Sequence, residues 1–71
     1  MKVNSTKLKS LTDQEITSLS QELLYAPHFK PESVLFQIFE FDEGESVISQ
    51  AEPILSSLLV ETSLRLNKLC L

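Results

Sequence analysis

The side chains of this sequence that could take part in chemistry are one histidine, one cysteine and a cluster of carboxylates. His28 lies in a short segment between two prolines, where a histidine can change its charge near neutral pH or bind a metal. A metal site needs further ligands, and no Cys, Asp or second His lies at ligand spacing from His28. Cys70 is the only cysteine, and Leu66 one helical turn before it indicates a small buried thiol. We therefore expect no catalytic residues, no metal site and no cofactor.

The carboxylates gather in one predicted turn, at Glu40, Asp42, Glu43 and Glu45, around the single glycine Gly44. Calcium and magnesium prefer clustered oxygen atoms, but the spacing does not match the twelve-residue calcium loop. A solvated acidic turn is the simpler interpretation. If the turn has a function, the net charge of −4 favours docking of a basic partner over metal binding.

The clearest local signal places the start of a helix at Thr12. The sequence Thr-Asp-Gln-Glu is a capping box, in which the Thr12 hydroxyl accepts from the Glu15 N–H and the Glu15 carboxylate reaches back. Pro27 ends the segment, because the residue before a proline avoids the helical region. We predict a helix over residues 12–26. Its apolar stripe consists of Ile16, Leu19, Leu23 and Ala26, widened by Leu24.

Residues 32–42 fit two kinds of secondary structure. The segment is rich in strand-forming residues, but Gln37 and Glu40 would lie on opposite faces of a strand and share one face of a helix. Pro31 also suits the first position of a helix. We predict a helix over 32–42, with a strand over residues 34–41 as the alternative. In both cases the apolar side chains of this segment form the centre of the core.

Residues 48–70 are predicted to form one long helix, which begins at a second capping box at Ser49 or one turn earlier at Ser46. A wide apolar arc is expected to face the core, and it consists of Ile54, Leu55, Leu58, Leu59, Leu66, Leu69 and Cys70. A smaller group lies on the opposite side and consists of Val60, Leu64 and Leu71. Because so short a chain has no obvious cover for this second group, we expect it to contact a partner, most simply a second copy of the chain.

Length and composition limit the fold. A chain of 71 residues makes one domain near the size at which a core alone confers stability, and an apolar content of 42% is too high for a disordered chain. Residues 1–10 carry three lysines and no acid, so we interpret them as a flexible basic arm before a single helical domain over 11–71. The predicted fold class is mainly α: a bundle of two to three helices (12–26, 32–42 and 48–70) completed by dimerisation. The alternative is α+β.

Net charge and hydropathy bear on function. The charge of −4 argues against direct contact with nucleic acid or an anionic membrane. No secretory signal core and no membrane-spanning stretch is visible. We expect a small cytoplasmic, non-enzymatic protein that regulates another protein, as an adaptor, inhibitor or chaperone-like protein, through the second apolar group and the acidic turn. The alternative is an inhibitor whose carboxylates mimic nucleic acid in the basic groove of a DNA- or RNA-binding enzyme.

Overall fold

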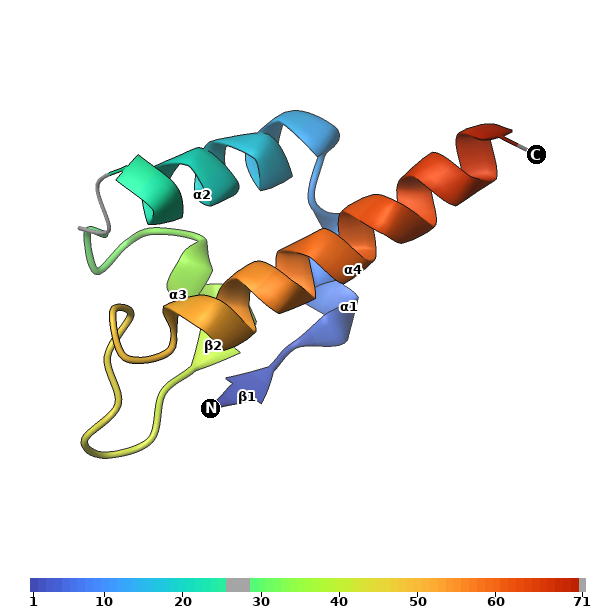
Figure 1. Ribbon diagram of the computed structural model, residues 1–71. Helices are drawn as coiled ribbons and strands as arrows, with labels where there is room; N and C mark the ends of the chain where they lie inside the picture. Colours follow the sequence, from blue (N-terminus) through green and yellow to red (C-terminus); the bar gives the residue numbers. More distant parts are fainter. Residues whose placement is uncertain (26–28, 71) are drawn as a thin grey trace.

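The computed structural model describes residues 1–25 and 29–70, with side chains up to residue 68. Helices predominate in this part of the chain, together with one short antiparallel pair of strands (Figure 1). In chain order, the elements are β1 (Lys2–Val3), α1 (Ser5–Ser10), α2 (Asp13–Tyr25), α3 (Leu35–Ile38), β2 (Phe39–Glu40) and α4 (Ala51–Cys70). The predicted mainly helical fold is thereby confirmed. Its completion by a second copy stays a prediction.

The long helix α4 is the axis on which the other elements are arranged (Figure 1). α2 packs along it, and the C-terminal end of α4 projects beyond the rest of the molecule. Twenty helical residues extend about 30 Å, so α4 accounts for most of the long dimension of the 42 × 23 × 21 Å molecule. The last turns of α4 therefore extend past the other described elements.

A single apolar core joins all the helices. Its most deeply buried side chains, each no more than 1% exposed, come from α3, β2 and α4. The buried cluster consists of Leu8, Leu11, Ile16, Leu19, Leu23, Leu35, Ile38, Phe39, Ile54 and Leu58. The expectation that the apolar side chains of residues 32–42 form the centre of the core holds for Leu35, Ile38 and Phe39, whereas Phe36 is exposed.

The predicted capping box opens α2. The Glu15 N–H donates to the Thr12 hydroxyl at 3.1 Å, and the Thr12 N–H donates to the Glu15 carboxylate at 2.9 Å. Two groups that would lack partners at the start of a helix are thereby satisfied. The stripe of Ile16, Leu19 and Leu23 is buried as predicted, whereas Leu24 is exposed. Ala26, Pro27 and His28, including the predicted end of this helix, lie outside the described residues.

Residues 1–10, for which the sequence predicted a flexible arm, form β1 and α1 instead. The Asn4 side chain caps α1 by accepting from the Lys7 N–H at 3.1 Å, and the Asn4 N–H donates to the Ile38 carbonyl at 2.7 Å. Leu8 is buried in the core. The arm interpretation was wrong because the partner of β1 is β2, nearly forty residues later, and no local pattern reveals such a pairing.

The helix predicted over 32–42 is much shorter in the structure. α3 ends at Ile38, and the backbone becomes extended at Phe39, where φ is −114° and ψ is 117°. Phe39 pairs with Val3 and Glu40 with Lys2 in the two-stranded sheet. The segment therefore contains both a helix and a strand, and neither prediction over its full length is correct. The pairing with β1 explains why the helix stops.

α4 begins at Ala51, three residues later than predicted. Before it, Ser46 and Ser49 exchange hydrogen bonds: the Ser46 N–H donates to the Ser49 hydroxyl at 2.8 Å, and the Ser49 N–H donates to the Ser46 hydroxyl at 3.1 Å. This turn takes the place of the capping box expected between Ser49 and Glu52. Pro53 lies in the first helical turn, where its missing N–H costs little.

The core-facing side of α4 differs from the predicted arc. Ile54 and Leu58 are buried, but Leu59 and Leu66 are 66% and 57% exposed. Glu61 is buried in their place, at 8% exposure. The helix is therefore rotated relative to the prediction, which had placed Leu59 and Leu66 on the side that faces the core. The side chains of Leu69 and Cys70, and all of Leu71, lie outside the described part of the chain.

Candidate functional site

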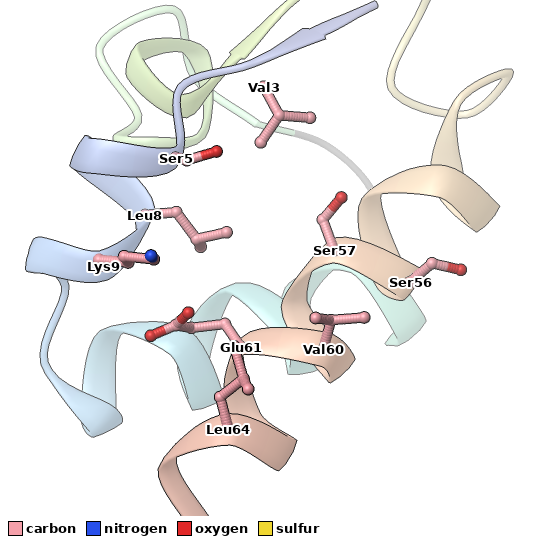
Figure 2. A pocket seen from close by; sticks show the side chains of 9 residues that line it. All are labelled: Val3, Ser5, Leu8, Lys9, Ser56, Ser57, Val60, Glu61 and Leu64. Atoms are coloured by element: carbon pink, nitrogen blue, oxygen red, sulfur yellow. The ribbon is translucent and has the colours of Figure 1, made fainter.

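A groove of about 370 Å³ separates α4 from the N-terminal elements β1 and α1 (Figure 2). Its lining residues are Val3, Ser5, Leu8 and Lys9 on one wall and Ser56, Ser57, Val60, Glu61 and Leu64 on the other. Figure 2 shows Val3 and Leu8 pointing across the gap toward Ser57 and Val60. The hollow is thus mainly apolar, with charged groups near one end.

Two apolar side chains of α4 remain open to solvent beside this groove. Val60 is 60% exposed and Leu64 is 49% exposed, although both line the same groove as the buried Leu8. The neighbouring α4 residues are small: Ser56 and Ser57 leave room for another backbone to approach. The Ser57 hydroxyl donates to the Pro53 carbonyl at 3.1 Å, so covering it would leave no unsatisfied donor. The groove can accept an apolar side chain from another molecule.

Arg65 fixes the separation of the groove walls. Its Nη1 donates to the Asp13 carboxylate at 2.7 Å, its Nε donates to Glu61 Oε1 at 3.0 Å, and its Nη2 donates to the Leu11 carbonyl at 2.8 Å. Longer contacts reach two carbonyls near the end of α1. One planar guanidinium therefore joins α4 to the end of α1 and the start of α2, which is a geometry that suits arginine and not lysine.

The electrostatics of this cluster agree with its geometry. The hydrogen bond to Asp13 raises the pKa of Arg65 above its ordinary value, and the bond to Glu61 acts in the same direction against the effect of burial. A buried carboxylate without a partner is very costly, so Glu61 can be buried only because Arg65 is beside it. This pair accounts for the rotation of α4: the Glu61–Arg65 side must face α1 and α2, which turns Leu59 and Leu66 outward.

The acidic turn lies in a different part of the molecule and is partly neutralised by its own chain. The amino group of Met1 approaches Glu45 at 2.9 Å and Asp42 at 3.3 Å, and the Asp42 N–H donates to Glu45 Oε1 at 2.7 Å. The backbone hydrogen bond from Asp42, and then the Met1 amino group, lower the pKa of Glu45. The hydrogen bond to Glu45 in turn raises the pKa of the amino group. Gly44 supplies the positive φ of 87° that the turn needs.

The predicted binding residues are thus divided between two places. Val60 and Leu64 line one groove, while the acidic turn does not contribute to it. Glu40 is exposed and lies opposite Lys2 in the sheet, and Glu43 is exposed in the turn. The remaining predicted residue, Leu71, is not described.

Sequence reasoning missed the second wall of the groove and the clamp that fixes it. Leu8 lies in the segment 1–10, which the sequence predicted to be a flexible arm, and no role was predicted for Arg65. One signal was available: Asn4 is a favoured N-cap residue, and a cap there would have indicated a helix that carries Leu8. The contacts of Arg65 with Asp13 and with the Leu11 carbonyl had no such signal, since these two partners are more than fifty residues away.

Within the described residues, no three side chains of His, Cys, Asp or Glu are placed to hold a metal ion together. No helix in this part of the structure is both long enough and apolar enough to cross a membrane. Comparison with protein-family models, with curated proteins and with solved structures gave no match to this chain. Its function must therefore be inferred from its own residues.

Proposed function

We propose that this chain is a small regulatory protein without catalytic activity that acts by binding another protein in the groove between α1 and α4. The observation that supports this is the exposure of Val60 and Leu64 above a hollow with apolar walls. Complete burial of such a side chain is worth up to about 1.5–3 kcal/mol. Two of them, with the groove wall, can offset part of the cost of association.

The acidic turn has a supporting role in this proposal. Glu43 is exposed and takes part in none of the described ion pairs, so it can attract a basic surface from a distance and raise the rate of association, whereas Asp42 is partly neutralised by the Met1 amino group. Glu45 is committed to the Met1 amino group and the turn backbone, and it shapes the turn. Adaptor, inhibitor and chaperone-like roles all use such a surface. A cytoplasmic site of action is part of the same proposal, since a lone thiol stays reduced there.

Mimicry of nucleic acid, the alternative suggested by the charge, receives less support. A mimic presents its carboxylates in rows at the spacing of phosphates. In this turn, Asp42 and Glu45 converge on one amino group, which removes much of their negative field. Apolar contact in the groove is therefore the favoured mode of binding.

The proposal can be tested by affinity capture from an extract of the source cells. Three baits are compared: the wild type, Leu64→Glu and Leu59→Glu. Leu59 is as exposed as Val60 but does not line the groove, so its substitution controls for a new charge on α4. Proteins bound through the groove, copies of the chain included, should be retained by the wild type and Leu59→Glu and lost from Leu64→Glu.

Identical sets of bound proteins on all three baits would contradict the proposal. So would loss from Leu59→Glu alone, which would place the binding surface on the other side of α4. Circular dichroism of each bait checks that the variants are folded.

A further inference from the structure

A single row of side chains on the exposed surface of α4 has an unusual order. It consists of residues four apart, which form one ridge on a helix: Glu52, Ser56, Val60, Leu64 and Lys68. All five are exposed. The row has an acid at its start, a base at its end, a small residue before the centre and a large one after it.

This order is complementary to itself when reversed. If two such rows lie antiparallel with Val60 at the centre, Ser56 of each copy lies opposite Leu64 of the other. At each end of the row, Glu52 of one copy lies opposite Lys68 of the other, so the dimer contains two such pairs. We propose that the groove between α1 and α4 binds the α4 helix of a second copy, antiparallel, about a two-fold axis at Val60. This inference rests on the proposed function, in which the groove binds protein.

Size matching supports the antiparallel arrangement. Leu64 of the second copy would enter over Ser56 and Ser57, where small side chains line the groove and the apolar wall of Leu8 and Val3 stands opposite. Large side chains facing small ones allow two helices to interdigitate at the 8–10 Å separation usual for packed helices. A parallel pair would place Leu64 against Leu64 and leave Ser56 facing Ser56.

The charges at the two ends of the row independently support the antiparallel arrangement. Among the side chains that the structure describes, neither Glu52 nor Lys68 forms an ion pair within its own chain. A parallel pair would bring each of them against the same charge. Only the antiparallel pair joins each to its opposite, which is a match that an unrelated partner has no reason to share.

The area that a stable dimer interface needs is larger than the row on α4 can supply, so the α1 wall of the groove must also take part. A stable interface buries about 800 Å² per copy, which is a substantial part of the 5150 Å² surface of this small chain. The row from Glu52 to Lys68 extends about 24 Å along a helix about 10 Å wide, too narrow a strip on its own. The groove wall of Val3, Leu8 and Lys9 adds to it, and the projecting end of α4 leaves the row accessible. We expect a dimer of about micromolar affinity.

Charge reversal gives the decisive experiment. In the purified full chain, Glu52→Lys and Lys68→Glu should each weaken self-association about tenfold at low salt, because two attractive pairs become two repulsive ones. An equimolar mixture of the two variants should form a heterodimer about as tight as the wild-type dimer, since both end pairs are then opposite in charge. Sedimentation equilibrium measures all three dissociation constants, and circular dichroism confirms folding.

A disulfide at the proposed axis provides a second readout. In a Cys70→Ser background, Val60→Cys should cross-link to its own copy under mild oxidation, because a residue on a two-fold axis lies opposite itself. Leu59→Cys in the same background is the matched control, which should remain largely uncross-linked.

The outcomes separate this inference from the function it rests on. A wild type that stays monomeric at millimolar concentration overturns the dimer, while capture of a foreign protein that depends on Leu64 would still support binding in the groove. A dimer in which the mixed charge variants gain nothing, or in which Leu59→Cys cross-links as well as Val60→Cys, overturns the antiparallel arrangement at Val60.

Discussion

The helix α4 presents Ile54 and Leu58 to the core, where they are almost fully buried, and Val60 and Leu64 to the groove, where about half of each remains exposed. Each side thus carries large apolar residues. What separates them is the pair Glu61 and Arg65: Glu61 is buried at the edge of the groove, and Arg65 bonds to the residues between α1 and α2 and to the start of α2. Polar partners have decided which apolar residues face inward. The side left outside is the one that we propose as the binding surface.

The largest effect of a substitution in α4 is expected on the side that faces the core. Leu58→Ala should lower the free energy of unfolding by about 2–5 kcal/mol, because it leaves a cavity among fully buried neighbours. Chemical denaturation measures this loss. Val60→Ala is the matched control on the groove side, and its effect should be much smaller. Equal losses for the two variants would show that both sides are buried to the same degree.

Loss of the Arg65 hydrogen bonds should have the next largest effect on stability. Arg65→Ala removes hydrogen bonds to a buried carboxylate and to the Leu11 carbonyl, and we expect a loss of about 1–3 kcal/mol in the free energy of unfolding. Arg65→Lys keeps the charge, but an ammonium group cannot make the several hydrogen bonds of the planar guanidinium, so this variant should recover only part of the lost stability. If Arg65→Lys is as stable as the wild type, the geometry of the guanidinium is not what fixes α4.

How much of this the sequence revealed depends on how far apart the partners lie. The Thr12 capping box was predicted because its two members are three residues apart. The exposure of Val60 and Leu64 was also predicted, from the period of the helix alone. The burial of Glu61 was not, because its partner Arg65 must itself be placed by Asp13 and by the carbonyls near the end of α1.

The same principle explains the error in the N-terminal segment. β1 and α1 exist because they pack on β2 and α3, and a polar segment with one buried leucine gives no periodic signal of that packing. The segment around Phe39 was ambiguous for a related reason, since its strand forms only where β1 pairs with it. Local patterns thus predicted the start of α2 and the exposed side of α4, and long-range contacts determined the rest.

A smaller effect is expected at the start of α2. Thr12→Ala removes the side chain that accepts from the Glu15 N–H, and loss of an N-cap costs about 0.5–2 kcal/mol. Thr12→Ser keeps the hydroxyl and should retain most of the stability. An unchanged denaturation midpoint for Thr12→Ala would mean that the cap contributes nothing to this fold.

Acid should weaken two local structures before it affects the core: the start of α2, which contains Glu15, and the acidic turn, which contains Glu45. The pKa of Glu15 is lowered, first by the backbone hydrogen bond from Thr12, and the pKa of Glu45 is lowered, first by that from Asp42. A lowered pKa means that the stabilisation is present above the unfolded value and is lost as the pH falls through the folded value. The midpoint temperature of thermal unfolding should therefore decrease when the pH is lowered below about 4.3, the ordinary pKa of a glutamate. Glu15→Gln combined with Glu45→Gln should reduce this dependence.

Leu64→Glu is expected to have the smallest effect on folding and the largest effect on self-association. Sedimentation equilibrium of the wild type and Leu64→Glu, at the same concentrations, tests most directly whether the groove side of α4 is a binding surface. We expect a dimer for the wild type and a folded monomer for Leu64→Glu, with Leu59→Glu still dimeric. A wild type that is monomeric throughout, or a Leu64→Glu variant that dimerises as well as the wild type, would contradict self-association through the groove.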